Sequence, residues 1–503
     1  MPALRDALAE VMDLRHAAAV LEWDQETFMP PGAAEARARQ VATLRRLAHE
    51  RFTRDEMATL LDAAQPADAL DADLVRVTRR DLRRATLLPA RLVAEQAEAS
   101  GRAKTAWKQA RESDDAGRFA PHLRRLVELA TEEADRTRPL IRDERGPGYA
   151  PPEADARYDA LLDTYEPGAS TADVARVFAA LRRELVPLVA AIAERPAPDD
   201  AFLHRPVPPE VQWAFGEEVA ADVGYRFENG RQDRSAHPFT TSFGRSDVRI
   251  TTRVDPSFFP TGFFGTVHEA GHALYEQNLD PALDRTPLAD GASLSVHESQ
   301  SRLWENLVAR SEAFWEGRYE RLQSRADAFA DVSRGDFVRA INRVRPSPIR
   351  VEADELTYHL HVLLRFEIER QLVAGTLAAD DVPDAWNAAT QELLGIAPPS
   401  DADGCLQDIH WSLGAFGYFP TYSLGTLMSV QLWTAAERDL GALAPQLATG
   451  SFAPLLGWLR THVHRWGRRK TAAEILHAAT GSALDAGPWL AYARAKYGAL
   501  YDL

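Results

Sequence analysis

The residues best suited to chemistry lie in one short segment, 266–277, which reads TVHEAGHALYEQ. It contains an HExxH motif that runs from His268 to His272. On a helix, positions i and i+4 lie one turn apart on the same face, so two imidazoles at this spacing can bind one tetrahedral metal ion. Glu269 projects beside the pair without binding the ion and can take a proton from a water molecule. The motif therefore predicts a metal-dependent hydrolytic site.

A catalytic metal site of this kind needs a third protein ligand and one open position. The segment 293–306 reads SLSVHESQSRLWEN, is helical by its spacing, and offers both His297 and Glu298. Two histidines with one glutamate form a well-attested hydrolytic set, which favours Glu298. Because most glutamates lie on solvated helix faces, the residues alone leave His297, Glu276 and Glu305 open as alternatives.

The elements that must position these side chains are mainly helices. Apolar residues recur at i, i+3, i+4 and i+7 within 123–130, and residues 170–173 form a capping signature ahead of a long apolar run. Only residues 247–254 alternate with period two as a strand does, and Asn-Gly at 229–230 is a tight-turn dipeptide. The sequence therefore predicts a mostly helical protein with one small sheet inserted mid-chain.

Composition and charge exclude several classes of partner. The 503-residue chain carries 58 basic and 74 acidic side chains, a net charge of −16, which argues against nucleic-acid binding. No run of about 18 uncharged apolar residues offers a membrane span, and the N-terminal segment has no apolar region typical of a secretory signal. Cys405 is the sole cysteine, so no internal disulfide can form. We therefore expect a cytoplasmic protein with no nucleic-acid or membrane partner.

Six motifs occur in the order found in a known family. HEAGH at 268–272 followed by HESQ at 297–300 resembles the metallocarboxypeptidases of the thermostable carboxypeptidase Taq type, peptidase family M32. The family's other motifs are also present: HPF at 237–239, DxRxT at 247–251, IRxxAD at 349–354 and GxxQDxHW at 404–411. The stretch WDQETFMPPGAAEAR around Trp23 is similar to the family's N-terminal region. The resemblance spans nearly the whole chain, and no motif departs from the family pattern.

The resemblance implies an all-α fold, a large helical body with a deep cleft similar to angiotensin-converting enzyme and neurolysin. One small antiparallel sheet is expected at the cleft edge. The whole chain, 1–503, is expected to form a single catalytic domain whose two helical halves flank the cleft. Family members look like homodimers that remove single residues from the free C-termini of peptides. They generally bind zinc, one ion per subunit, and Co²⁺ can occupy the same ligands.

The resemblance also assigns the reacting groups. It implies two zinc histidines, a third ligand and a general base at His268, His272, Glu298 and Glu269. We expect the base to take a proton from the attacking water and to pass it to the leaving amine. The oxyanion that forms needs a hydrogen-bond donor besides the metal. Tyr422 is the first candidate, because related clefts place a tyrosine hydroxyl there, and His410 and His237 are alternatives. The alternative to a catalytic role for Tyr422 is a structural one, as an aromatic residue packed in the cleft wall.

An exopeptidase must also recognise a free α-carboxylate, which pairs with the planar fork of arginine through two hydrogen bonds. Arg350 and Arg249 stand in two of the motifs, and we favour Arg350. Arg249 shares a strand face with Asp247, so an internal ion pair is its structural alternative. Arg350 precedes Asp354 by four residues and has the same alternative. We expect loop-fixing rather than reacting roles for Asp247, Thr251, Gln407 and Asp408.

The remaining polar residues are expected to be structural. His359 and His361 stand two positions apart and so do not share a helix face, which argues against a second metal site. Cys405 occupies a position that its motif leaves open and is expected to be a buried thiol. Two other functions remain as hypotheses: an endo-oligopeptidase or dipeptidyl carboxypeptidase on the same scaffold, and a metal-stabilised peptide-binding protein without turnover.

Overall fold

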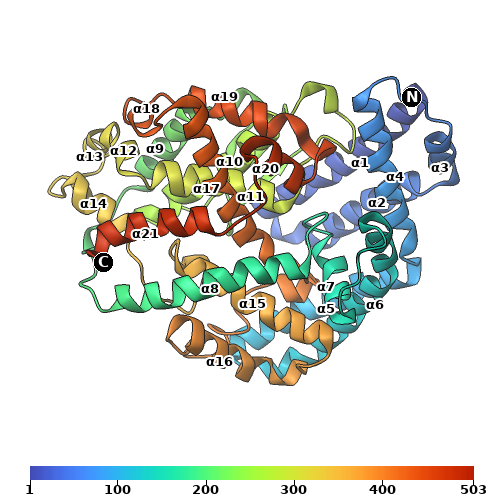
Figure 1. Ribbon diagram of the computed structural model, residues 1–503, viewed down its shortest axis with the longest axis horizontal. Coiled ribbons are helices and arrows are strands. Elements are labelled where there is room, and N and C mark those ends of the chain that lie inside the picture. Colours follow the sequence, from blue (N-terminus) through green and yellow to red (C-terminus); the bar gives the residue numbers. More distant parts are fainter. The chain divides into compact units, whose positions relative to one another are not determined.

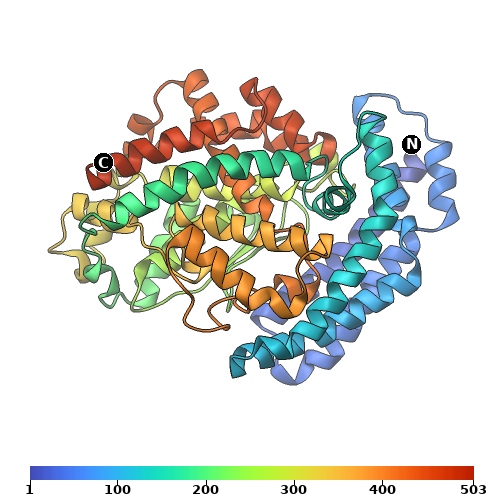
Figure 2. The same ribbon diagram turned by 60° about the horizontal axis from the view of Figure 1, so that its bottom comes forward.

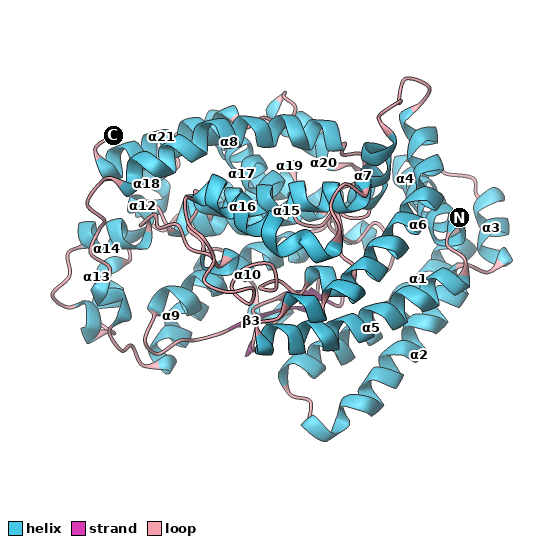
Figure 3. Ribbon diagram, turned by 90° about the horizontal axis from the view of Figure 1, so that it is seen from below, coloured by secondary structure: helices cyan, strands magenta, loops and turns pink.

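Helices dominate the computed structural model, which describes residues 1–503 and is 69% helical. The predicted all-α fold class with one small sheet is confirmed (Figure 3). Contacts divide the chain into two compact units, each assembled from three stretches. Unit 1 comprises Met1–Arg83, Pro198–Ile341 and Met428–Ala483, and unit 2 comprises Arg84–Ala197, Asn342–Leu427 and Leu484–Leu503. The single catalytic domain over 1–503 and its cleft stay predictions. No helix has the length and apolar character needed to cross a membrane.

Each unit has its own set of helices, and two helices contribute residues to both. Unit 1 contains α1 (Pro2–Thr27), α2 (Ala34–Phe52), α3 (Asp55–Asp62), α9 (Pro209–Asp222), α10 (Phe259–Gln277), α11 (Leu294–Arg302), α12 (Glu312–Glu316), α13 (Tyr319–Gln323), α14 (Arg334–Ile341), α18 (Ala444–Ala448), α19 (Ala453–His462) and α20 (Ala472–Thr480). Unit 2 contains α5 (Ala90–Ser113), α6 (Ala120–Arg145), α7 (Glu153–Leu162), α8 (Thr171–Ala193), α15 (Thr357–Ala374), α16 (Val382–Leu394) and α21 (Gly487–Tyr501). The shared helices are α4 (Ala69–Leu87) and α17 (Pro420–Leu440).

The helices of unit 2 form where the sequence predicts apolar stripes. In α6, Leu123, Leu126 and Ala130 are buried, as their spacing predicts. Helix α8 begins where Ser170 Oγ accepts a hydrogen bond from the backbone N of Asp173 at 3.1 Å, which satisfies one first-turn amide. Figure 2 shows α8, in green, beside α21, in red, although the two lie far apart in the sequence. Packing between distant segments therefore completes this unit.

The sheet lies in unit 1 and is mixed rather than antiparallel. Its strands β1 (Gln232–Arg234), β2 (Thr240–Ser242) and β3 (Val248–Thr252) take the order β1–β3–β2. The short turn between β2 and β3 makes that pair antiparallel, whereas β1 pairs with β3 in parallel. The expected antiparallel sheet is wrong because β3 lies in the centre and β1 joins its other edge in the same direction.

Two local features of the sheet follow from close packing. Thr251, which lies on the same strand face as Asp247 and Arg249, is buried, and its hydroxyl accepts hydrogen bonds from Phe239 N at 2.9 Å and Ser235 Oγ at 2.7 Å. Gly230 has an extended backbone, with φ 172°, rather than the left-handed conformation of a tight turn. A Cβ at Gly230 would lie 1.9 Å from Val248 O, so the approach of β3 requires glycine there.

Aromatic packing holds α10 in unit 1. Phe259 and Phe263, one turn apart on this helix, stack with their ring centroids 5.3 Å apart. Phe215 of α9 and Trp315 of α12 pack against Phe263 at centroid distances of 5.5 and 5.3 Å. This cluster fixes the N-terminal half of α10, and Figure 1 shows the helix next to α11, its main helical neighbour on the other side. The HExxH segment thus sits on a well-anchored helix.

Candidate metal centre and active site

Two imidazoles lie one turn apart on α10. The ring centroids of His268 and His272 are 4.9 Å apart, as the i, i+4 spacing predicts. Their side chains remain 19% and 17% exposed, although α10 around them is buried on almost every side. Both rings are therefore held by the core and still accessible to solvent.

Glu298 from α11 approaches both imidazoles. Its Oε2 lies 3.6 Å from His268 Nε2 and 3.4 Å from His272 Nε2, and the ligand atoms of the three residues all lie within 4.8 Å of one another. A tetrahedral metal with bonds of about 2.0–2.1 Å separates its ligand atoms by roughly 3.4 Å. Two nitrogens and one carboxylate oxygen at these distances fit a zinc-type ion. The sequence-predicted ligands are thus brought together.

The surroundings of Glu298 keep its carboxylate charged. Arg302 Nε donates to Oε1 at 2.6 Å, and Ser301 Oγ donates to Oε2 at 3.0 Å. Burial raises the pKa of Glu298, but the charges of Arg302 and His268 outweigh burial and hold the pKa well below its ordinary value. The carboxylate is therefore ionised at neutral pH, as a metal ligand must be.

His268 is oriented by a second carboxylate. Its Nδ1 lies 2.9 Å from Glu305 Oε2, and Glu305 also pairs with Arg302 and Arg310. Glu305 lies in η6 (Leu303–Ala309), a π-helical continuation of α11, and such widened turns occur often at functional sites. The contact leaves His268 Nε2 facing Glu298, so Glu305 orients the His268 ring and lies outside the three-residue group.

His272 is contacted by another imidazole. Its Nδ1 lies 2.6 Å from His297 Nδ1, and His297 Nε2 lies 2.8 Å from Glu276 Oε1. Burial lowers the pKa of His272, and the hydrogen bond with Glu298 raises it by less. The net result is a pKa of about 3. The ring is therefore neutral at physiological pH, the form that binds metals. His297 contacts His272 directly, whereas Glu276 reaches it only through His297, and neither belongs to the group of His268, His272 and Glu298.

Glu269 lies in the same turn of α10 but outside the ligand group. It is buried, and Thr240 Oγ1 on β2 lies 2.7 Å from its Oε2 and 2.9 Å from its backbone O. Burial raises the pKa of Glu269 above the ordinary range, against the opposing charge of His268. A carboxylate with a raised pKa holds a proton more readily than an ordinary glutamate does.

Gly271 allows the two ligand-bearing helices to approach each other. A Cβ at this position would lie 2.6 Å from Ser301 Cα and 2.8 Å from Gln300 O on α11. Glycine inside a helix costs about 1 kcal/mol relative to alanine, and here the close approach explains it. The separation of α10 and α11, and with it the reach of Glu298, depends on the missing side chain.

A second polar cluster lies in unit 2, around Arg350. Its guanidinium donates to Asp408 Oδ1 from Nη2 at 2.7 Å and to Tyr358 OH from Nη1 at 2.7 Å. Arg365 of α15 also donates to Asp408, from Nε to Oδ2 at 2.7 Å. Asp354, the alternative partner from sequence, instead accepts from the backbone of α15 at Leu356 N and Thr357 N. Arg350 is thus buried in an ion pair, but with Asp408.

Two proposed oxyanion donors belong to the same cluster. Tyr422 OH lies 3.5 Å from His410 Nε2, at the limit of a hydrogen bond. The Arg350 guanidinium lies over the Tyr422 ring, 5.1 Å from its centroid. Burial lowers the pKa of His410 to about 4, so its ring is neutral at pH 7. Gln407 anchors this loop by accepting from Arg350 N at 2.8 Å, as its loop-fixing role predicts.

The other two substrate-binding candidates lie in unit 1. Arg249 on β3 donates twice to Asp247, both times at 2.8 Å, and its guanidinium lies over Trp23, 4.3 Å from the ring centroid. This is the ion pair with Asp247 that the sequence offered as the structural alternative to substrate binding by Arg249. His237 is exposed, and its carbonyl accepts from Ser235 Oγ at 2.6 Å.

Three polar partners were not predicted from the sequence: Arg302, Arg365 and Thr240. Arg302 follows Glu298 by four residues on one helix, so helical spacing could have indicated this pair. Arg365 and Asp408 are 43 positions apart, and no local pattern predicts their contact. Thr240 lies on a three-residue strand with no periodicity of its own.

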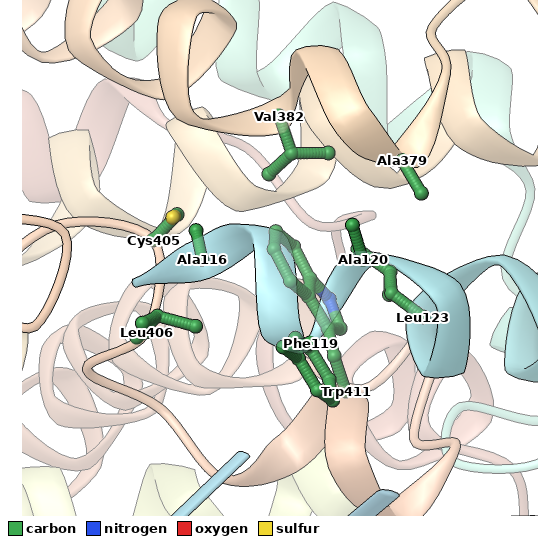
Figure 4. Close-up of a pocket in the computed structure, with 9 residues that line it drawn as sticks. All are labelled: Ala116, Phe119, Ala120, Leu123, Ala379, Val382, Cys405, Leu406 and Trp411. Carbon is green, nitrogen blue, oxygen red and sulfur yellow. The ribbon is translucent and has the colours of Figure 1, made fainter. Parts of the chain in front are cut away.

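Cys405 has no place in this chemistry. It lines a small apolar pocket in unit 2 (Figure 4), together with Ala116, Phe119, Ala120, Leu123, Ala379, Val382, Leu406 and Trp411. Burial raises the pKa of its thiol to about 12. The thiol is therefore protonated and shielded at neutral pH, in keeping with the structural role expected of it.

Comparison with known proteins places this site in a family. The sequence profile described as carboxypeptidase Taq (M32) metallopeptidase matches residues 3–497. Thermostable carboxypeptidase 1 of Thermus thermophilus is 44% identical over 490 residues, which cover 96% of this chain and 95% of that protein. Carboxypeptidase 1 of Bacillus subtilis is 38% identical over 504 residues, which cover 99% of this chain and 98% of the relative.

Solved structures agree with the sequence matches. The M32 carboxypeptidase of Deinococcus radiodurans R1 superposes with a TM-score of 0.95 at 43% identity, and the match covers 100% of this chain and 99% of that one. A Pyrococcus furiosus carboxypeptidase superposes with a TM-score of 0.93 at 36% identity and covers 99% of this chain and 98% of that one. With the HExxH group in place and matches over nearly its full length, the chain belongs to the carboxypeptidase Taq (M32) family and is a metallocarboxypeptidase.

Proposed function

We propose that this metallocarboxypeptidase depends on zinc and releases single amino acids from the free C-termini of peptides. The observation that carries the proposal is the arrangement of His268, His272 and Glu298, whose ligand atoms lie within 4.8 Å of one another. Glu269 lies beside this group without joining it. Together they form the two-histidine, one-glutamate set of hydrolytic metal sites.

The three residues would hold one zinc ion per subunit, and Co²⁺ would accept the same donors. When bound, the ion supplies Lewis-acid polarisation of the scissile carbonyl and a lowered pKa for water. The ionised Glu298 and the neutral His272 present the lone pairs that such an ion needs.

Glu269 is proposed as the general base. Its carboxylate takes a proton from the attacking water and then delivers that proton to the nitrogen of the leaving amine. The raised pKa that burial gives Glu269 supports the second step, because a weaker acid holds the proton until the amine can accept it. Thr240 keeps the carboxylate in one orientation through its hydroxyl contact.

Arg350 is proposed to recognise the substrate's C-terminal carboxylate. Arg350 and Arg365 both pair with Asp408, so two guanidinium groups share one carboxylate and one positive charge is not balanced within this group. A buried cation in excess favours an anionic ligand. Arg249 is supported less strongly, because its charge is balanced one-to-one by Asp247.

The oxyanion donors stay a proposal as well. Tyr422 is the first candidate, with His410 as its neighbour at 3.5 Å and His237 as the alternative in unit 1. We propose a cytoplasmic location because the chain's single cysteine, Cys405, fits a reducing compartment. The homodimer rests on the family resemblance, and light scattering of the purified protein tests it.

Digestion of a mixed-sequence peptide pool, followed by mass spectrometry, tests the reaction. We expect ladders that lose one C-terminal residue at a time, no cleavage of C-terminally amidated peptides, and arrest by a chelator. Loss of residue pairs or internal cuts would instead indicate a dipeptidyl carboxypeptidase or an endo-oligopeptidase. Chelator-resistant cleavage would contradict the metal dependence.

Glu269→Gln tests the base. Because the amide cannot accept the proton, we expect kcat to fall by about 10²–10⁴-fold while bound zinc stays stoichiometric. Metal analysis and initial rates on one peptide give both quantities. The exposed Glu316→Gln on α12 is the matched control and should leave both unchanged. A Glu269→Gln enzyme with wild-type kcat would remove Glu269 from the mechanism.

A further inference from the structure

The side chains that the sequence left open as third ligands reach the two histidines of the metal group instead, either directly or through a neighbour. Glu305 reaches His268 directly, whereas Glu276 reaches His272 only through His297. We infer that Glu276 and His297 form a relay that holds His272 in the one tautomer able to bind the metal. This inference rests on the proposed metal site.

The direction of each hydrogen bond follows from what the atoms can donate. A metal on His272 Nε2 needs a lone pair there, so the ring proton must lie on Nδ1. That proton is donated to His297 Nδ1 at 2.6 Å. His297 then carries its own proton on Nε2, which is donated to Glu276 Oε1 at 2.8 Å. Because the partner of His297 Nε2 is a carboxylate oxygen, which accepts this proton, Glu276 sets the direction of both bonds.

The His297 ring is held in place by packing. Its centroid lies 4.6 Å from that of His272 and 5.2 Å from that of Tyr275. A Cβ at Gly291 would lie 2.8 Å from His297 Cδ2, so glycine leaves room for the ring. Ala292 N donates to Tyr275 OH at 3.1 Å, which fixes the tyrosine against the imidazole. The relay is therefore built into the core and needs no mobile side chain.

The relay also links the two elements that supply the ligands. Glu276 stands one turn after His272 on α10, and His297 directly precedes Glu298 on α11. A single hydrogen-bonded chain thus spans both helices beside the metal group. Partners of this kind change metal affinity by about 10–100-fold when they are removed.

Glu276→Gln is the sharpest test, because it keeps the shape and removes only the fixed direction. An amide can present either its oxygen or its NH₂ group to His297, so His272 is no longer held in one tautomer. We expect the Kd for Zn²⁺, measured by chelator competition on metal-free protein, to rise about 10–100-fold. The thermal stability of the metal-free variant should match that of the wild type.

Substitutions of His297 separate the relay from simple packing. His297→Gln keeps an acceptor towards His272 and a donor towards Glu276, and should bind Zn²⁺ nearly as tightly as the wild type. His297→Phe keeps a ring but has neither group, and should lose at least as much affinity as Glu276→Gln. If the phenylalanine variant does not fold, the comparison of Glu276→Gln with His297→Gln decides.

Two further variants complete the experiment. Glu369→Gln changes a buried carboxylate in unit 2, outside the ligand group, and should leave the Kd for Zn²⁺ unchanged. His268→Ala removes a ligand and should abolish tight binding. Wild-type affinity in Glu276→Gln and His297→Phe, with loss in His268→Ala, would overturn the relay alone. Wild-type affinity in His268→Ala would overturn the proposed metal site and the relay with it.

Discussion

Buried carboxylates at single positions differ in charge because their partners differ. Glu298 is paired with the cation Arg302 and stays ionised. Glu369 in unit 2 accepts only from neutral groups, among them Tyr158 OH at 2.7 Å and Trp411 Nε1 at 2.8 Å. Burial raises the pKa of Glu369 to about 7 despite these hydrogen bonds. The same residue type thus serves as a fixed charge in one unit and as a titrating group in the other.

Glu369→Gln should flatten part of the pH dependence of stability. The folded state holds this proton up to about pH 7, whereas the unfolded chain releases it near pH 4.5. Stability is therefore lost as pH rises from 4.5 through 7, by roughly 2–3 kcal/mol between pH 5 and 8. Unfolding midpoints in urea at several pH values measure the effect, as the difference between wild type and variant. Parallel curves for the two proteins would contradict the raised pKa.

At the residue scale, spacing along one helix indicated which side chains would lie together. The pair His268 and His272 follows from i, i+4 geometry. Glu298 needed the family resemblance, because its approach depends on how α11 packs on α10. Arg365 had no signal at all, since its partner Asp408 is 43 positions away. Long-range polar pairs are set by tertiary packing, which local patterns do not encode.

At the scale of elements, the spacing of α10 and α11 decides whether the ligands meet. Gly271→Ala would gain about 1 kcal/mol of helix propensity but would overpack the contact with Ser301 and Gln300, where overpacking costs about 1–3 kcal/mol. We expect a net loss of stability and a higher Kd for Zn²⁺, because α11 must move away with Glu298. Chemical denaturation and chelator competition measure the two effects.

Gly457→Ala is the matched control for this substitution. Gly457 lies inside α19 in unit 1, and nothing lies within 4 Å of a Cβ built there. Alanine should therefore stabilise the protein by about 0.4–1 kcal/mol and leave metal affinity unchanged. Equal behaviour of the two variants would show that the α10–α11 contact does not limit the site.

Elements were predictable where their pattern is long and local. The cap at Ser170 and the buried stripe of α6 match the sequence predictions, and β3 lies within the predicted 247–254. Strands β1 and β2 have three residues each, too few for a period to show. The parallel pairing of β1, and the close contact at Gly230, arise only when β3 takes the central position.

At the scale of the whole molecule, the metal group lies entirely within unit 1. Removal of the metal should therefore lower the thermal stability of that unit, because an ion at 100 times its Kd contributes about 2.7 kcal/mol to the folded state. Calorimetry with and without a chelator measures the shift, and added Zn²⁺ should restore it. The His268→Ala variant should show no response to either addition, and an equal response would place the stabilising metal elsewhere.

The shielded thiol of Cys405 can report the temperature at which unit 2 unfolds in that experiment. It is the chain's only sulfhydryl, it belongs to unit 2, and its high pKa makes it inert to alkylating dyes while its pocket stays closed. The temperature at which the dye begins to react with the thiol therefore reports the unfolding of unit 2, independently of the calorimetric signal. If a chelator lowers the labelling temperature by as much as it lowers the calorimetric transition temperature, the two units unfold as one cooperative body. If the labelling temperature does not change, each unit unfolds independently.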